Sequence, residues 1–250
     1  IEMHTSGLPA HMSGDGIMGP DARLSAENLS LVSSAGTVLL EDASFEWRQG
    51  DFVAVVGPAG CGKTALLRML AGAWPPPVAG RVSSLDACGA GVLLVPSVGF
   101  LLPRRATLRK CLAYPEAIAP FDEELQDALS LCGLARLAGK LDCESDWSTA
   151  LPLGDLQRLV FVRLIARWPA GVRWLLLDQV DSALDEATAF TLHEHLVARL
   201  PRLVGLVVTS QHADVVRRAG WRRFAIDPTT KRIAELRLCA STGEAPGYSS

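Results

Sequence analysis

The chain has 250 residues, of which 49% are hydrophobic, so it is long enough for one α/β domain with a large buried core and an inserted segment. Its 24 basic and 27 acidic residues give a net charge of −3, which lacks the basic excess of a dedicated nucleic-acid binder, so we expect no nucleic-acid partner. The sequence contains no run of about twenty uncharged apolar residues, which a membrane-spanning helix would require. Its six cysteines are scattered without a C-x-x-C pair, which favours reduced, cytosolic thiols.

The first regular pattern follows a polar N-terminal segment. Residues 1–22 show no apolar period and are interpreted as a linker or a vector-derived segment. Short apolar or alternating runs at 23–31, 37–40 and 44–47 are divided by turn-forming residues, which predicts an antiparallel sheet edge. Phe52–Val56 is a continuous apolar run that opens into a glycine-rich turn, as expected of a buried parallel strand.

Helical spacing dominates the middle of the chain. The pattern predicts a helix over 64–71, a buried strand over 92–95 and a second helix over 121–133, with Asp122 as its N-terminal cap. Because helical signals continue around that second helix, we predict a helical subdomain of about 102–157, inserted into a strand-and-helix core.

The last third of the chain returns to alternating strands and helices. Helices are predicted at 156–168 and 185–200, and buried strands at 172–177 and 204–209. Such alternation predicts an α/β fold, with a parallel sheet covered by helices on both faces. The segment 240–250 is small and polar and is predicted to be a disordered tail, so the folded domain is expected to span 23–239.

A phosphate-binding pattern lies between the first buried strand and the first helix. The segment matches G-x-x-x-x-G-K-[ST] with the residues Gly57, Pro58, Ala59, Gly60, Cys61, Gly62, Lys63 and Thr64. Its glycines let backbone N–H groups converge on phosphate oxygens, and the helix N-terminus adds a partial positive charge. In such a loop Lys63 bridges the β- and γ-phosphates and Thr64 ligates magnesium. We therefore predict a nucleoside triphosphate and Mg²⁺ as ligands.

A carboxylate at the end of a neighbouring buried strand is needed to help hold the magnesium. The run Trp174–Asp178 supplies one in Asp178. An aspartate after an apolar strand is common by itself, and it becomes a metal candidate because the phosphate loop is present. Together these features predict a P-loop NTPase core of the RecA-like kind.

Further motifs resemble one family. The segment 147–158 (WSTALPLGDLQR), followed after a helix by 175–185 (LLLDQVDSALD), resembles the signature, Walker B and D-loop succession of ABC transporter ATPases. The stretches 70–80 (LAGAWPPPVAG) and 107–115 (TLRKCLAYP) are similar to the peroxisomal subfamily D half-transporters and their bacterial SbmA/BacA-like relatives. The resemblance covers roughly 24–226.

This resemblance implies an ATP-binding domain that pairs head to tail with a second nucleotide-binding domain. Each ATP then lies between the phosphate loop of one copy and the signature of the other. It also implies a membrane-spanning permease domain, fused or separate, and a location on the cytoplasmic face of the cell (inner) membrane. The implied contacts to the partner's nucleotide are the signature residues and the D-loop aspartate: Leu151, Pro152, Leu153, Gly154, Asp155, Gln157 and Asp185.

Three positions depart from the family's pattern. Ser97 stands where a glutamine follows the third core strand; we keep it as a metal and catalytic candidate, although its side chain is too short for the usual reach. Pro152 replaces the signature serine, which removes a hydroxyl and a backbone N–H. Gln179 replaces the catalytic glutamate, and an amide cannot take a proton from water.

His212 stands where the family's switch histidine belongs, although a solvated loop histidine would look the same in sequence. We take Gln179 and His212 as facing the γ-phosphate. Because Gln179 and Pro152 lie in one chain, pairing with a normal partner would weaken both composite sites. We therefore predict an ATP-binding domain that couples ATP binding, with slow or absent hydrolysis, to transmembrane transport. The alternative is a non-hydrolysing pseudo-ATPase whose ATP-gated dimerisation regulates a partner.

Overall fold

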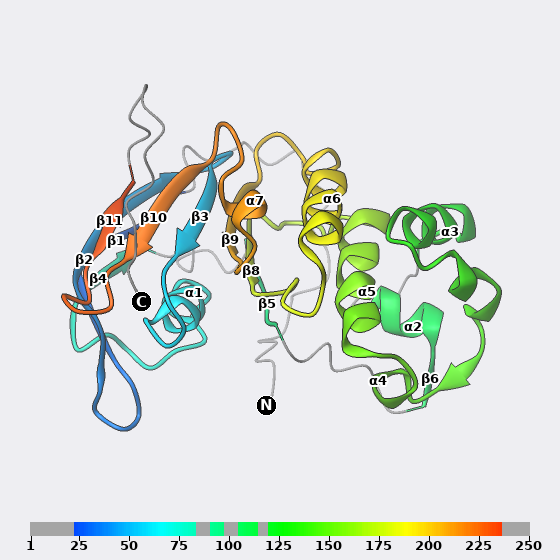
Figure 1. The fold of residues 1–250 in the computed structure, drawn as a ribbon, viewed down its shortest axis with the longest axis horizontal. Helices are drawn as coiled ribbons and strands as arrows, with labels where there is room; N and C mark the ends of the chain where they lie inside the picture. The colour runs from blue at the N-terminus through cyan, green and yellow to red at the C-terminus, as the bar shows by residue number, and fades with distance from the viewer. Residues whose placement is uncertain (1–22, 84–90, 98–104, 115–119, 237–250) are drawn as a thin grey trace, which may run out of the picture.

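The structure, a computed structural model, describes four stretches of the chain: 23–83, 91–97, 105–114 and 120–236 (Figure 1). The predicted linker at 1–22 and the predicted tail at 240–250 lie outside the described residues, as do residues 102–104 and 115–119 of the predicted helical subdomain.

A six-stranded sheet forms the centre of the described fold. In spatial order its strands are β11 (Ile233–Glu235), β10 (Arg222–Ile226), β3 (Phe52–Val56), β9 (Gly205–Thr209), β8 (Trp174–Asp178) and β5 (Val92–Val95). From β10 to β5 all neighbours are parallel, and β11 pairs antiparallel with β10. The carboxyl ends of the five parallel strands therefore meet at one edge, where ligands bind in open α/β sheets.

An antiparallel sheet lies beside the central one, as the sequence predicts. It has the order β2–β1–β4, with β1 at Arg23–Val32, β2 at Val38–Arg48 and β4 at Ala79–Ser83. The predicted runs at 37–40 and 44–47 contribute to one strand, β2, which begins at Val38. The strand stays continuous through Asp42, whose φ of 50° takes up an irregularity in the pairing with β1.

Two hydrophobic cores cover opposite faces of the central sheet, and alternate residues of β8 supply both. Trp174 and Leu176 pack towards α1 (Lys63–Leu70) and the antiparallel sheet. Leu175 and Leu177 pack towards the helices of the other face, α5 (Leu153–Ala166), α6 (Glu186–Val197) and α7 (Ala213–Val216). Figure 1 shows α1 and these three helices on opposite sides of the sheet. Each leucine that is fully buried in this way contributes roughly 1.5–3 kcal/mol.

Short helices follow one another on the far side of α6. The elements here are β6 (Ala106–Thr107), α2 (Leu108–Ala113), α3 (Asp122–Leu131), the 3₁₀ helix η2 (Ala135–Lys140), β7 (Glu144–Ser145) and α4 (Trp147–Ala150). The indole of Trp147 donates to the carbonyl of Ala106 at 2.9 Å, and Arg109 forms ion pairs with Asp142 and Asp122, so side chains tie these short elements together.

Several helices and strands begin at residues other than those predicted. The cap of α3 is Phe121 rather than Asp122, because the Phe121 amide donates to the Glu124 carboxylate at 2.9 Å. α5 begins at Leu153, three residues before its predicted start, and β8 begins at Trp174 rather than at 172. The predicted fold class is nevertheless confirmed: a parallel sheet with antiparallel strands and helices on both faces.

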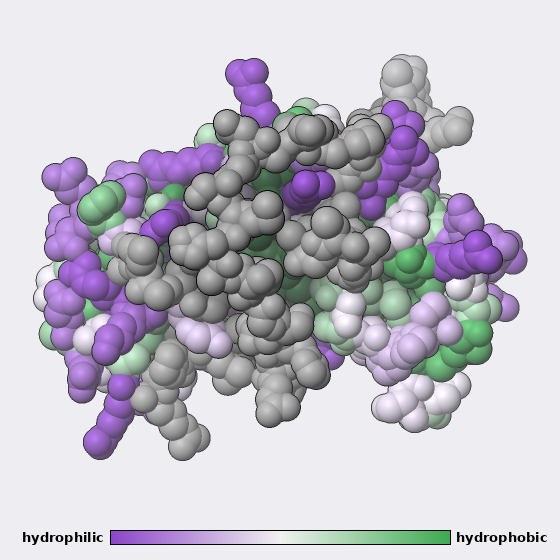
Figure 2. Space-filling view, turned by 180° about the vertical axis from the view of Figure 1, so that it is seen from behind, coloured by the Kyte–Doolittle hydropathy of each residue, from purple (hydrophilic) through white to green (hydrophobic). Residues whose placement is uncertain are grey.

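The end of the molecule that carries α2, α3 and α4 presents mainly hydrophilic residues in the rear view of Figure 2, where it lies at the left. Within the described stretches, no helix combines the length and the hydrophobicity needed to cross a bilayer.

Candidate nucleotide-binding site

The loop between β3 and α1 has a backbone that glycine makes possible. Gly57, Gly60 and Gly62 have φ angles of 149°, 75° and 107°. A Cβ on Gly57 would lie 2.7 Å from the sulfur of Cys61, and one on Gly62 would lie 2.9 Å from a backbone carbonyl. Side chains at Gly57 and Gly62 would be both strained and obstructed, and a side chain at Gly60 would be strained. The loop therefore curls as the phosphate-binding pattern requires.

Lys63 lies under this loop, with only 7% of its surface exposed. Its ammonium donates to the carbonyls of Gly57 at 2.7 Å and Pro58 at 2.8 Å. α1 begins at Lys63 after Gly62, which supplies no side-chain cap to the free N–H groups of the first turn. A lysine charge and uncapped amides lie next to the exposed residues 57–60, an electropositive arrangement suited to an anion.

Two hydroxyls meet one carboxylate at the edge of the sheet. Thr64 Oγ1 donates to Asp178 Oδ1 at 3.1 Å, and Thr209 Oγ1 donates to the same oxygen at 2.9 Å. A carboxylate and a hydroxyl beside a phosphate loop are the oxygen donors that Mg²⁺ uses together with phosphate oxygens and water. The donor set therefore fits magnesium, although the described residues contain no cluster of three or more His, Cys, Asp or Glu side chains able to hold a metal alone.

Gln179 follows Asp178 in a strained conformation. Its φ is 52°, which is uncommon for a residue other than glycine. The backbone N–H of Gln179 stabilises this conformation, because it donates both to the Thr209 carbonyl at 2.9 Å and to the Thr209 hydroxyl at 3.1 Å. Thr209 thus fixes both Asp178 and Gln179, and sequence reasoning missed it. In the sequence Thr209 is the last residue of the predicted strand 204–209, and nothing there shows that this strand lies next to β8.

Two further predicted residues lie at the same edge. His212 follows β9, with its ring Nε2 3.0 Å from the carbonyl oxygen of Asp181. Ser97 lies two residues after β5 and is partly buried, and residues 98–104 after it are outside the described part of the chain. Because β5 pairs with β8, Ser97 is at the same edge of the sheet as Asp178.

The signature segment forms a second group, attached to the loop 179–185 between β8 and α6, which is called the D-loop below. Figure 1 shows the start of α5 well away from α1, across the central sheet. Pro152 is the N-cap of α5, and the next residue, Leu153, is 47% exposed. A Cβ on Gly154 would lie 3.3 Å from the carbonyl oxygen of Ala183, so the helix start packs closely on the D-loop. The structure therefore does not bring the signature segment to the phosphate loop of the same chain.

The remaining members of this group make contacts inside the chain. The Gln157 side chain, in a residue 2% exposed, donates to Ser182 at 2.9 Å and accepts from the Ala183 amide at 2.7 Å. Asp155 forms an ion pair with Arg136. Leu151 is partly buried just before the helix.

Asp185, the D-loop aspartate, is the N-cap of α6. It accepts from the Thr188 hydroxyl at 2.7 Å and from the Thr188 amide at 2.9 Å. These hydrogen bonds lower the pKa of the Asp185 carboxyl.

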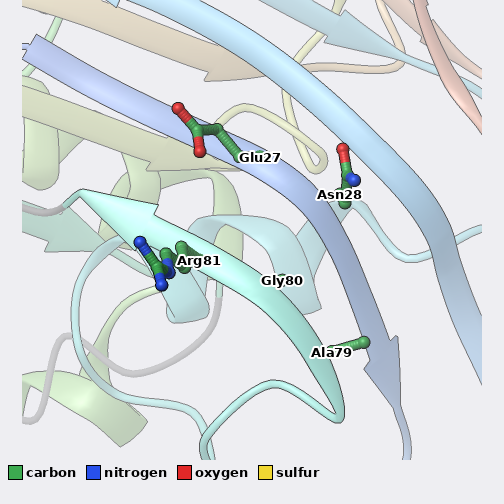
Figure 3. Close-up of a pocket in the computed structure, with 5 residues that line it drawn as sticks. All are labelled: Glu27, Asn28, Ala79, Gly80 and Arg81. Carbon is green, nitrogen blue, oxygen red and sulfur yellow. The ribbon is translucent and has the colours of Figure 1, made fainter.

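A pocket elsewhere in the described residues is unrelated to this site. It lies between β1 and β4 and is lined by Glu27, Asn28, Ala79, Gly80 and Arg81 (Figure 3). Residues 57–60 of the phosphate loop are instead exposed.

Comparison with known proteins identifies the family. The sequence profile of the ABC transporter family matches residues 40–180, which is more than half of the chain. This chain belongs to the ABC transporter family. The matched region of this ABC transporter chain includes the phosphate loop, the signature segment and Asp178.

Individual relatives support the same assignment. An uncharacterized ABC transporter ATP-binding protein of Haemophilus influenzae is 32% identical over 186 residues, covering 74% of this chain and 30% of the relative. The ATP-binding cassette sub-family D member 3 of Mus musculus is 28% identical over 195 residues, covering 72% of this chain and 27% of the relative, which agrees with the predicted resemblance to subfamily D. This ABC transporter chain thus spans less than a third of the length of these relatives.

A solved structure agrees on the fold. The structure of a bacterial Atm1-family ABC exporter with ATP bound has a TM-score of 0.70 to this ABC transporter chain at 22% identity, covering 87% of this chain and 39% of the exporter chain.

Proposed function

We propose that this chain is the nucleotide-binding domain of an ABC transporter that binds MgATP and hydrolyses it slowly or not at all. The observation that carries the proposal is a contrast at one sheet edge. Lys63 and the contact of Thr64 with Asp178 at 3.1 Å are intact, whereas Gln179 offers an amide in place of a general base.

Binding is supported by the loop residues and the sheet edge. Lys63 and the first-turn amides of α1 would bind the phosphates, and Thr64 with Asp178 would hold the metal. Magnesium, when bound, neutralises charge on the phosphate oxygens. Gln179 and His212 would face the terminal phosphate, and Ser97 would lie near the metal.

Slow hydrolysis is supported by the three departures from the family's pattern. Loss of a positioned general base at Gln179 typically costs about 10²–10⁴ in rate. Pro152 cannot donate to a partner's phosphate, and each lost charge-assisted donor costs roughly 1.5–3 kcal/mol in a closed dimer. Ser97 is shorter than the glutamine it replaces.

Assembly is supported by the exposed residues 57–60 of the phosphate loop. We propose that a second nucleotide-binding domain, identical or different, presents its signature segment to this loop, with a membrane-spanning permease domain attached to the dimer. The proposed location is the cytoplasmic face of the cell (inner) membrane. The names of the relatives, which are transporters or their ATP-binding proteins, support this assembly.

A second candidate function is a pseudo-ATPase whose ATP-gated dimerisation regulates a partner without turnover. It is favoured by the same amide at Gln179, because binding groups persist where the base is lost. Phosphate release from the purified protein tests this candidate: slow release that depends on Lys63 would contradict a regulator without turnover.

Nucleotide binding to three proteins tests the proposal: wild type, Lys63→Ala and the control Lys140→Ala, which removes an exposed lysine at the end of η2. We expect wild type and Lys140→Ala to bind MgATP equally. Lys63→Ala should bind about tenfold to a hundredfold more weakly, because a charged hydrogen-bond donor is lost. Turnover of order 1 s⁻¹ that Lys63→Ala abolishes would contradict the proposal of impaired hydrolysis.

A further inference from the structure

A carboxylate and an imidazole lie together in the interior behind the sheet edge. Asp181, in the D-loop, and His193, on α6, have side chains that are 1% and 0% exposed. His193 Nε2 lies 3.0 Å from Asp181 Oδ2. The ring of Phe161 meets His193 edge-on, with centroids 5.1 Å apart, so the pair is surrounded by apolar packing as well as by its own polar contacts. The site proposed above makes no use of this pair.

The pair extends to His212 through one hydroxyl. Ser210 Oγ donates to Asp181 Oδ2 at 2.7 Å and accepts from the His212 amide at 3.0 Å. The ring of His212 makes the second link, because its Nε2 lies 3.0 Å from the carbonyl oxygen of Asp181. A carbonyl only accepts, so this nitrogen is the donor. Asp181 therefore holds His212 at its backbone and at its ring.

Burying these two side chains together carries a cost. An acid and a base buried together pay a desolvation cost, and apolar residues of similar volume are often as stable or more stable. Here Asp181 Oδ1 and His193 Nδ1 also have no hydrogen-bond partner, which adds to the cost. Burial raises the pKa of Asp181, but the hydrogen bond and charge of His193, with the hydrogen bond from Ser210, outweigh it and leave the pKa lowered. The carboxylate form is thus the one the surroundings maintain.

We infer that Asp181 is a positioning residue for His212, that Ser210 transmits its effect, and that His193 is the buried partner that holds Asp181 in place. The inference rests on the proposed function, in which His212 faces the terminal phosphate of ATP. With its backbone held through Ser210, His212 would exchange the Asp181 carbonyl for an oxygen of the γ-phosphate, which ADP lacks, as the acceptor of its Nε2–H. The network should therefore contribute to the preference for ATP over ADP.

Ser210→Ala is the sharpest test, because it cuts the link to the His212 amide and leaves the contact between Asp181 and His193 in place. The matched control is Ser130→Ala, which removes a hydroxyl bonded at 2.8 Å to a carbonyl within α3, far from the site. Dissociation constants for MgATP and MgADP would be measured by titration calorimetry for wild type and both variants. We expect Ser210→Ala to weaken MgATP binding about threefold to tenfold, the effect of one hydrogen bond, and to leave MgADP binding within about twofold.

Two further variants separate positioning from simple destabilisation. Ser210→Thr keeps a hydroxyl and should restore the wild-type preference for ATP. His193→Leu leaves Asp181 without its buried partner and should reduce the same preference, along with the melting temperature. Equal weakening of ATP and ADP by Ser210→Ala, or an unchanged ratio of the two, would overturn the inference while the proposed function stands. Wild-type protein that binds neither nucleotide would overturn both.

Discussion

The phosphate loop and the signature segment are the two surfaces that a head-to-tail dimer would bring together, and they differ in what they have kept. In the loop, the left-handed glycines remain and Lys63 is held at 2.7 Å from a loop carbonyl. In the signature segment the packing residues remain, since Gly154 fits against the D-loop and Gln157 bonds to it. At the exposed position Pro152, the hydroxyl and the backbone N–H that the family's serine would offer a phosphate are absent, and the neighbouring Leu153 is exposed and apolar.

The difference shows that the framework of a site and its chemistry can change separately. Pro152 has φ −64° and ψ 156° at the N-cap of α5, a conformation that proline adopts without strain. Leu153 is 47% exposed, so its side chain is not needed for packing. The fold therefore accommodates Pro152 and Leu153, and we expect these two residues to weaken only the binding of a partner's phosphate by this segment.

The largest expected effect sharpens the contrast by restoring the missing base. Gln179→Glu should raise phosphate release about 10²-fold to 10⁴-fold under saturating MgATP, because the phosphate loop and Asp178 are already in place. The control is Gln211→Glu, which adds the same charge at an exposed D-loop contact, where the amide of Gln211 donates to Ser182 at 3.0 Å. A phosphate assay on both variants checks it. If Gln179→Glu binds MgATP and still releases no phosphate, Gln179 is not the limiting departure and the defects at Pro152 and Ser97 dominate.

A second change tests the other surface. Pro152→Ser should strengthen MgATP-dependent dimerisation about tenfold to a hundredfold, since it returns a hydroxyl and a backbone N–H to the partner's phosphate. Pro201→Ser, after α6 and outside the signature segment, is the matched control. Sedimentation velocity with and without MgATP measures the effect. Wild-type protein that already dimerises as tightly as Pro152→Ser would show that Pro152 does not weaken the interface.

The sequence could predict the parts of this fold that depend on local pattern. Phe52–Val56 and Val92–Val95 are strands with the predicted bounds, because a continuous apolar run marks a core strand. The predicted burial of Val92–Val95 is wrong, since its residues are only partly buried and β5 lies at the end of the six-stranded sheet. The phosphate loop lies between its strand and helix as predicted, since its glycines are needed where φ is positive.

The rest depends on contacts between distant segments. β4 is mostly exposed and carries no apolar run, so only its pairing with β1 makes it a strand. Thr209 and Ser210 look like an ordinary strand end until β8 is placed beside them. Asp181 and His193 are polar residues on a loop and a helix, and sequence alone gives no reason to bury them together.

A smaller effect tests whether charge holds the loop to which the signature segment is attached. The pKa of Asp181 lies below its ordinary value of 3.8, so the stability it contributes is present above about pH 4 and is lost as the pH falls further. Asp181→Asn should therefore be less stable than wild type at neutral pH, and the gap should narrow as the pH falls below 4. Urea unfolding of both proteins between pH 6 and pH 3 measures this. Other carboxylates titrate in both proteins, so their contributions cancel in the difference between the two free energies of unfolding. A difference that stays constant with pH would show that the Asp181 charge does not stabilise the loop.

The smallest effect concerns the ion pair of Asp155 with Arg136, whose side chains are 15% and 54% exposed. Asp155→Asn should lower the free energy of unfolding by about 0.2–1 kcal/mol, because water screens an exposed partner, and salt at about 1 M should remove most of the loss. Asp127→Asn is the control, since Asp127 pairs with Arg199 at 2.8 Å away from the signature segment. If Asp155→Asn instead weakens MgATP-dependent dimerisation and Asp127→Asn does not, Asp155 contacts the partner's nucleotide. The signature segment would then retain more of its binding chemistry than its outward-facing apolar residues indicate.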